Sequence, residues 1–306
     1  MYNSKNEAHK TRHKSMKKII LSMLALVVVA GGGWVGYQHF TGPQKIQAVK
    51  MVALGDSLTQ GVGDPTAKQG YTGRIKKDLT NKTGVAVSMT NYGKSGDRSD
   101  QILKRLQDSP TQQKNLKKAN VILMTVGGND LMKTIKANIF ISQPTQLTNQ
   151  VKKSTSSYEN NLQKLLKEVR KYNSQAPIFL FGNYNPLYVY FANFKSFNQS
   201  VSEYNTINKQ LISQYNGYYV PTFKQLTYGQ YQTASARNKL VKDAKLANAG
   251  TAGNANVVST LTKNDTERNM YISSADHFHP NSKGYDMMTD LLMKQMLKHD
   301  QWLYAK

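Results

Sequence analysis

Ser57 is the side chain around which nucleophilic chemistry can be arranged, because it lies in the turn that follows a short apolar stretch of the chain, 49–54. A serine hydroxyl is a useful nucleophile only beside a general base. Asp276 precedes His279 by three residues, so one tight turn can hold a carboxylate against an imidazole and orient it. This pattern predicts acyl transfer in which Ser57 attacks, His279 is the base and Asp276 orients the base.

Other polar side chains near these residues are assigned lesser roles. Ser95 is a rival nucleophile, but nothing in its loop supplies a base. His277 is interpreted as a bystander to the catalytic base. Asp56 and Asp130 are interpreted as hydrogen-bond partners within their own turns. The chain has no cysteine, and we expect neither a metal ion nor a cofactor.

Alternating strands and helices must position these side chains. Short apolar runs predict five buried strands, at 49–54, 85–91, 119–126, 178–182 and 218–221. Apolar residues at helical spacing predict helices at 71–82, 99–106, 151–172, 199–215, 236–247 and 282–298. Strands that alternate with helices predict an α/β fold, a three-layer α/β/α sandwich with a roughly five-stranded parallel sheet.

Polar, glycine-rich segments follow the first three predicted strands, at 55–58, 91–97 and 127–130. Functional residues of parallel sheets gather beyond the carboxyl ends of the strands. A tetrahedral intermediate needs hydrogen-bond donors, each typically worth about 3–4 kcal/mol of barrier. We expect the backbone N–H groups of Ser57 and Gly96 and the side-chain amide of Asn129 to converge there as an oxyanion hole.

These segments, together with 276–280, resemble the signature of the SGNH, or GDSL-type, hydrolase family across residues 49–298. The layout is most similar to the extracellular lipase/acylhydrolase branch of Gram-positive bacteria. The resemblance implies a flavodoxin-like SGNH fold. It assigns the family's four name-giving residues to Ser57, Gly96, Asn129 and His279, and the triad acid to Asp276. Position 93 is glycine where relatives vary, so the donor role is carried to Gly96.

The resemblance implies a serine ester hydrolase that works through an acyl-enzyme. The expected substrate is the ester of a lipid or an acylated glycerophospholipid, as for a lipase or a lysophospholipase-like esterase. Two alternatives stay open. One is removal or transfer of O-acetyl groups on cell-wall polysaccharide, because this fold serves both chemistries. The other is a non-catalytic module that binds the cell envelope.

An aromatic segment at 184–197 follows the fourth predicted strand and therefore lies at the rim of the expected site. Four of its side chains are candidates for substrate binding: Tyr184, Tyr188, Tyr190 and Phe191. The alternative is that these rings pack a helical flap onto the core, and the two roles are compatible.

The charge of the chain is strongly positive, with 41 Lys and Arg against 18 Asp and Glu among 306 residues. Such a charge favours anionic surfaces. The basic residues are scattered and lack a nucleic-acid recognition motif, so we expect an anionic membrane or cell-wall surface as partner and no nucleic acid.

The N-terminal part predicts a location. A basic segment at 1–18 precedes an apolar one at 19–40, which is the pattern of an export signal or a membrane anchor. We expect an extracytoplasmic enzyme that one uncleaved N-terminal helix anchors in the membrane. The alternative is a secreted enzyme, cleaved near Ala30. A linker at 41–48 and a hydrolase domain at 49–306 complete the expected organisation.

Overall fold

The computed structural model describes residues 44–65, 68–137, 144–247 and 267–305. The chain divides into two compact units, one at Ile46–Leu303 and a smaller one made of Met1–Lys45 and Tyr304–Lys306. The predicted segments 1–18 and 19–40 lie outside the described residues. The predicted domain boundaries stay a prediction.

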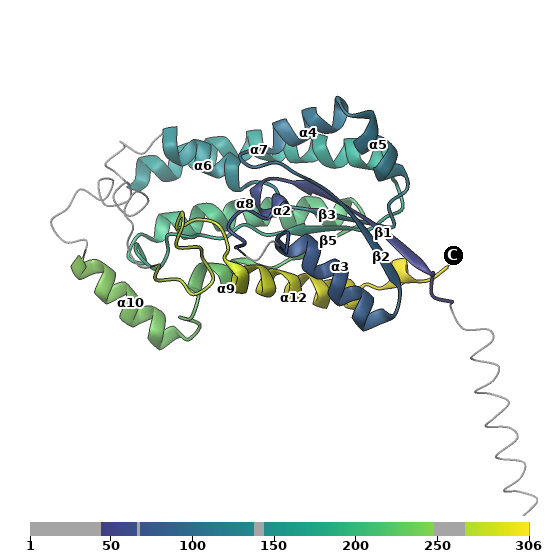
Figure 1. Cartoon of the computed structure of the whole chain (residues 1–306). Helices are drawn as coiled ribbons and strands as arrows, with labels where there is room; N and C mark the ends of the chain where they lie inside the picture. Colours follow the sequence, from purple (N-terminus) through teal and green to yellow (C-terminus); the bar gives the residue numbers. More distant parts are fainter. Residues whose placement is uncertain (1–43, 66–67, 138–143, 248–266, 306) are drawn as a thin grey trace, which may run out of the picture. The chain divides into compact units, whose positions relative to one another are not determined.

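Five parallel strands form the sheet, in the order β2-β1-β3-β4-β5 (Figure 1). Their bounds are β1 (Ala48–Gly55), β2 (Ala86–Gly93), β3 (Val121–Met124), β4 (Ile178–Phe181) and β5 (Gly217–Val220). Every residue of β3 and β4 is buried, as is usual for the central strands of a parallel sheet covered on both faces. The predicted α/β sandwich with a five-stranded parallel sheet is confirmed.

Helices cover both faces of this sheet (Figure 1). On one face pack α3 (Gly70–Thr83) and α12 (Ser282–Lys298). The other face is covered by α4 (Ser99–Gln107), α5 (Pro110–Lys117), α6 (Gly128–Ala137), α7 (Pro144–Tyr172) and α8 (Lys195–Gln214). Shorter or peripheral helices are α2 (Ser57–Gln60), α9 (Phe223–Tyr228), α10 (Ala234–Ala247) and a 3₁₀ turn (Gln301–Leu303).

The core explains why the strands keep their register. Side chains of β1, β3 and β4 that point to one face pack with α7 and α8, as Leu54 and Leu180 do. Side chains on the opposite face meet α3, where the ring centroids of Phe181 and Tyr71 lie 4.6 Å apart. Each large apolar side chain buried in this way contributes about 1.5–3 kcal/mol. A register shift in one strand would therefore exchange the two faces at a high cost.

The predicted membrane-anchored, extracytoplasmic location is corrected by the structure. Across the described ranges, 44–65, 68–137, 144–247 and 267–305, no helix is long and apolar enough to cross a membrane. The location prediction, which needs such a helix, is therefore wrong as far as the described residues go. The segment 19–40, on which it was based, lies outside them.

Candidate active site

Ser57 is the first residue of α2, at the sharp turn where β1 ends. Asp56 caps this short helix, because its carboxylate accepts a hydrogen bond of 3.0 Å from the Leu58 N–H. Gly61 ends the helix after a single turn, with φ at +92°. The first N–H groups of a helix have no partner within it, so the Ser57 N–H is free to serve as a donor to a ligand.

A continuous hydrogen-bonded chain joins the three residues predicted to be catalytic. Ser57 Oγ lies 2.9 Å from His279 Nε2, and His279 Nδ1 lies 2.6 Å from Asp276 Oδ2. The second carboxylate oxygen of Asp276 accepts the N–H groups of Phe278 and His279, at 3.0 and 2.9 Å. These bonds from backbone N–H groups to the carboxylate close the tight turn that the spacing of Asp276 and His279 predicts.

The carboxyl group of Asp276 is held in its charged form. Partial burial on its own raises the pKa of Asp276, but the hydrogen bonds from the His279 ring and from two backbone N–H groups outweigh this effect. The pKa of Asp276 is therefore lowered below its usual value. An ionised carboxylate at this position fixes the ring orientation and stabilises an imidazolium when one forms.

His277 is engaged in a separate buried pair. Its Nδ1 lies 2.6 Å from Glu267 Oε2, and its ring meets the Tyr190 ring edge-on, with centroids 6.2 Å apart. Its backbone is left-handed, with φ at +53°. The structure thus brings His279, and not His277, to the Ser57 hydroxyl. Ser95 is exposed, and its N–H donates to the Gln60 side chain.

The expected oxyanion donors lie just beyond the carboxyl ends of three neighbouring strands, with Ser57 and Asn129 in the first turns of α2 and α6 and Gly96 in a loop. Gly96 is exposed and left-handed, with φ at +83°. The amide of Asn129 donates one hydrogen to the Asp97 carbonyl, at 2.9 Å, which leaves the second hydrogen of the amide for a ligand. The N–H of Gly93 already donates to the Asn91 side chain, so Gly96 suits the donor role better.

Asp56 and Asp130 bind partners within the loops of the site. The Thr125 hydroxyl donates to Asp56 at 2.7 Å. Asp130 accepts both the N–H and the hydroxyl of Ser99, at 3.0 and 2.5 Å, and so ties the start of α4 to the start of α6. Burial raises the pKa of both carboxyl groups, although these hydrogen bonds oppose the shift.

Replacing Asp56 with Asn is expected to remove one pH-dependent contribution to stability. Because burial raises its pKa, Asp56 keeps a proton to higher pH in the folded than in the unfolded chain. Its contribution to the free energy of unfolding is therefore lost as the pH rises from the usual aspartate value of 3.8 through the raised pKa. We expect urea unfolding at several pH values to show that the free energy of unfolding of the Asp56→Asn variant increases relative to that of the wild type as the pH rises. A pH-independent difference would contradict the raised pKa.

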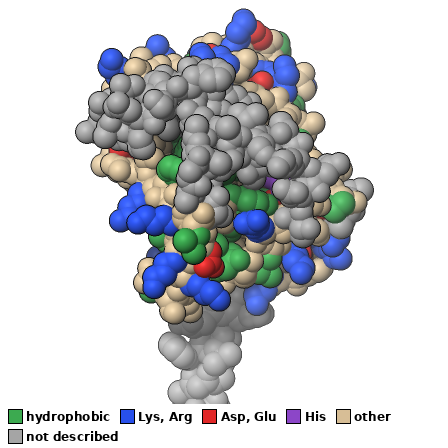
Figure 2. All heavy atoms as spheres, turned by 90° about the vertical axis from the view of Figure 1, so that its left-hand side faces the viewer, with side chains coloured by type: hydrophobic (Ala, Val, Ile, Leu, Met, Phe, Trp, Pro, Cys, Tyr) green, Lys and Arg blue, Asp and Glu red, His purple; other side chains and the backbone are tan. Residues whose placement is uncertain are grey.

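A pocket opens directly beside Ser57 and Asn129. Its lining is mostly apolar and comes from the α2 turn, α6, the 183–187 loop, α8 and the loop before α12. Its side chains are Asp56, Leu58, Leu131, Met132, Asn183, Tyr184, Asn185, Pro186, Leu187, Phe197, Val201 and Phe278, besides Ser57, Gly128 and Asn129. Figure 2 views the end of the molecule at which the strands finish, where hydrophobic side chains gather among Lys and Arg.

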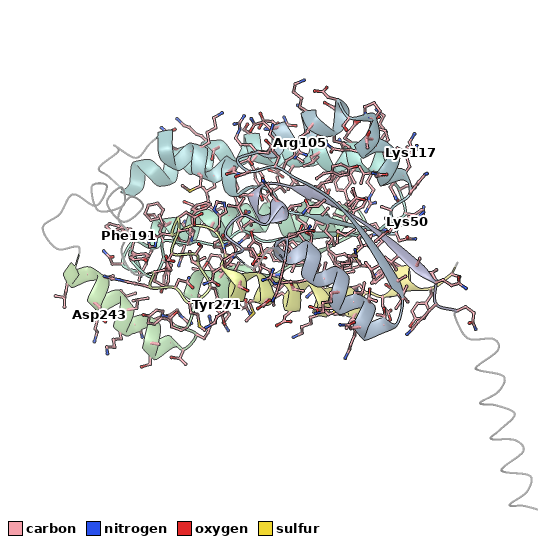
Figure 3. All side chains as sticks on the ribbon, in the orientation of Figure 1. Lys50, Arg105, Lys117, Phe191, Asp243 and Tyr271 are labelled. Atoms are coloured by element: carbon pink, nitrogen blue, oxygen red, sulfur yellow. The ribbon has the colours of Figure 1, made fainter. Side chains whose placement is uncertain are left out.

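Only one of the four aromatic candidates lines this pocket. Tyr184 does, and its hydroxyl donates to the Phe278 carbonyl at 2.8 Å. Tyr188 packs in a small cluster with Ala244, and Phe191, labelled in Figure 3, packs with Leu187. The segment forms turns and not a helical flap, with α8 beginning at Lys195. Substrate contact by Tyr188, Tyr190 and Phe191 stays a prediction that this pocket does not favour.

Several pocket residues escape sequence analysis. Leu131, Met132 and Val201 have the same apolar character as ordinary core residues, and only the fold shows that they line a pocket beside Ser57. Asn183, two residues after the end of β4, is another. The one signal available was position, because each lies close beyond a strand end or on the first turns of a helix there.

The protein is an α/β/α sandwich with a hydrogen-bonded serine, histidine and aspartate at the carboxyl ends of its parallel strands, an arrangement typical of serine hydrolases. Residues 53–287 match the GDSL-like Lipase/Acylhydrolase family. YpmR of Bacillus subtilis is 31% identical over 252 residues, which is 82% of each chain. The spore germination lipase LipC of Bacillus licheniformis is 28% identical over 169 residues, covering 54% of this chain and 76% of LipC.

Solved structures agree on the fold. The lipase Lip_vut3, from a goat rumen metagenome, matches with a TM-score of 0.58 and 23% identity, covering 80% of this chain and 96% of the lipase. The chain belongs to the GDSL-like lipase/acylhydrolase family. It is a carboxylic ester hydrolase, as the members of this family are. The alternative of a non-catalytic envelope-binding module is therefore dropped.

Proposed function

We propose that the protein hydrolyses esters with acyl chains longer than acetyl, with Ser57 as the nucleophile. The observation that carries this proposal is the chain of hydrogen bonds from Ser57 through His279 to Asp276, which opens onto an apolar pocket. Each methylene group transferred from water into such a pocket contributes about 0.8 kcal/mol. The family's lipase members, LipC among them, fit an acyl substrate of this kind.

In the proposed mechanism, His279 Nε2 takes the proton of Ser57 as the Oγ atom attacks the ester carbonyl carbon. The oxyanion receives hydrogen bonds from the Ser57 and Gly96 N–H groups and the Asn129 amide. The intermediate collapses when His279 returns the proton to the leaving alcohol. Water, deprotonated by the same imidazole, then cleaves the acyl-enzyme and releases the acid. Asp276 stabilises the imidazolium in both halves of the cycle.

The proposed chain-length preference is tested by narrowing the pocket. Met132 lines it from α6 and is partly exposed, so a bulkier Trp has room to enter. For Met132→Trp we expect kcat/KM for p-nitrophenyl octanoate to fall by about tenfold, since lost apolar burial of 1–2 methylene groups is worth about that much. Hydrolysis of p-nitrophenyl acetate in the same variant should change by less than about twofold, because acetate does not reach this part of the pocket.

Met270→Trp is the matched control, because Met270 is 41% exposed and does not line this pocket. This variant should hydrolyse both p-nitrophenyl octanoate and p-nitrophenyl acetate at the wild-type kcat/KM. A wild-type enzyme that prefers acetate to every longer chain would contradict the proposal and favour the O-acetylesterase alternative. Attraction of the basic chain to anionic membrane or wall surfaces stays a prediction.

A further inference from the structure

We propose that Arg105 is a positioning residue for the oxyanion hole, in which one guanidinium group fixes the loops that carry the donors. The inference rests on the proposed roles of Ser57, Gly96 and Asn129. Arg105 lies in α4, in the layer that covers the sheet on the side of α7 (Figure 3). Its side chain reaches the carboxyl ends of β1 and β2.

The guanidinium donates to acceptors on three separate segments. Nη2 lies 3.1 Å from the carbonyl of Gly55, two residues before Ser57. Nη1 lies 2.8 Å from the carbonyl of Tyr92, near the end of β2. Nε lies 2.8 Å from the carboxylate of Asp97, which directly follows a glycine with left-handed backbone. A single side chain thus joins the turn that presents the nucleophile to the loop of the second donor.

The third donor is joined to the same centre through Asp97. While the carboxylate of Asp97 binds Arg105, the carbonyl oxygen of Asp97 accepts the Asn129 amide at 2.9 Å. This bond sets the direction in which the remaining amide hydrogen of Asn129 points. A displacement of Asp97 would therefore move the flanking Gly96 N–H and the Asn129 amide together.

The burial and shape of the pair explain why arginine suits this position. The Asp97 side chain is 7% exposed and the Arg105 side chain is 21% exposed. Both charges are therefore largely shielded from water and are neutralised by each other. A guanidinium presents its N–H groups in a rigid planar fork, whereas a lysine ammonium is a point charge on a flexible stem. Lysine can keep the ion pair with Asp97, but it cannot also hold the carbonyl groups of Gly55 and Tyr92 in this geometry.

Arg105→Lys is the direct test. We expect kcat for a p-nitrophenyl ester to fall by about 10- to 100-fold, because misplacing a catalytic group by about 1 Å can cost about 100-fold. KM should change by less than about twofold, since the acyl pocket is not touched. Lys104→Met is the matched control, because Lys104 lies in the same helix and makes an exposed ion pair with Asp108. It should keep wild-type kcat and KM.

Phenylboronic acid gives a readout that a merely structural role would not change. Its boron accepts the Ser57 oxygen and becomes a tetrahedral anion while the proton passes to His279, so it reports on the oxyanion hole. Its inhibition constant should rise in Arg105→Lys by about the factor by which kcat falls. Thermal unfolding of the variant shows whether it is folded at the assay temperature.

A double-mutant cycle keeps the inference falsifiable if Arg105→Lys is also less stable. If Arg105 acts through the donor set, combining Arg105→Lys with Asn129→Ala should cost less than the product of the two single effects. Multiplicative effects, or an Arg105→Lys enzyme with unchanged kcat and boronate inhibition, would overturn the inference. Ser57→Ala separates the two proposals: full activity in that variant refutes the proposed function, whereas an inactive Ser57→Ala beside a normal Arg105→Lys refutes only the role of Arg105.

Discussion

Ser57→Ala is expected to lower kcat for a p-nitrophenyl ester by about 10⁴- to 10⁶-fold, the range found when a nucleophile that acts as part of a triad is removed. The hydroxyl of Ser57 is the one that lies against the imidazole of His279, at 2.9 Å. Alanine removes the attacking oxygen but keeps the backbone N–H that starts α2. The fold should stay intact, and thermal unfolding of the variant checks this.

Ser95→Ala is the matched control for this experiment. Ser95 lies in the neighbouring glycine-rich loop, is exposed, and contributes its backbone N–H and not its hydroxyl to the hydrogen bond with Gln60. We expect its kcat to stay within about threefold of the wild-type value, because the His279 imidazole contacts the Ser57 hydroxyl and not that of Ser95. A Ser57→Ala enzyme with near-normal turnover, or a dead Ser95→Ala enzyme, would reverse the assignment.

His279→Asn is expected to cause a loss of about 10⁴- to 10⁶-fold, because nucleophile and base act as one unit. The imidazole is the only group in contact with both the Ser57 hydroxyl and the Asp276 carboxylate among the described residues. Without it the serine keeps its proton at neutral pH. Steady-state kinetics on the purified variant measures the loss.

His277→Asn is the control for the base. Asn tolerates the left-handed backbone that His277 adopts, so the catalytic turn should keep its shape. The variant loses stability, since Glu267 then lacks its buried partner. Its kcat should nevertheless stay within about tenfold of wild type, because His277 does not contact Ser57. The opposite pattern, with His277→Asn inactive and His279→Asn active, would mean that the two histidines exchange roles.

The fold could be predicted from the sequence because its central strands are buried on both faces. Runs such as Val121–Met124 and Ile178–Phe181 are continuously apolar, and the parallel arrangement follows from the helical segments between them. The helix Pro110–Lys117 could not be predicted, because its sequence is mostly polar. Its one fully buried apolar residue, Leu116, gives no apolar period, and its start is set by the Ser109 cap.

The hydrogen-bonded chain of the site could be predicted because its residues stand in short, recognisable sequence patterns. Asp276 and His279 are three residues apart, and the Asp276 carboxylate closes the tight turn between them by accepting the His279 N–H. The pocket and the role proposed for Arg105 could not be predicted from the sequence. In the sequence Arg105 is one basic residue among many in an amphipathic helix. Its acceptors, Asp97, Tyr92 and Gly55, lie 8, 13 and 50 residues before it. Only the strand order brings them together.

The most direct test of the central claim is covalent labelling with a fluorophosphonate, in which a serine oxygen displaces fluoride from phosphorus. Only a serine activated by a base reacts quickly. We predict a single adduct on the intact protein, mapped by peptide mass spectrometry to Ser57, and no adduct on the Ser57→Ala variant under the same conditions. An adduct on Ser95, or equal labelling of the wild type and Ser57→Ala, would contradict the assignment of Ser57 as the nucleophile.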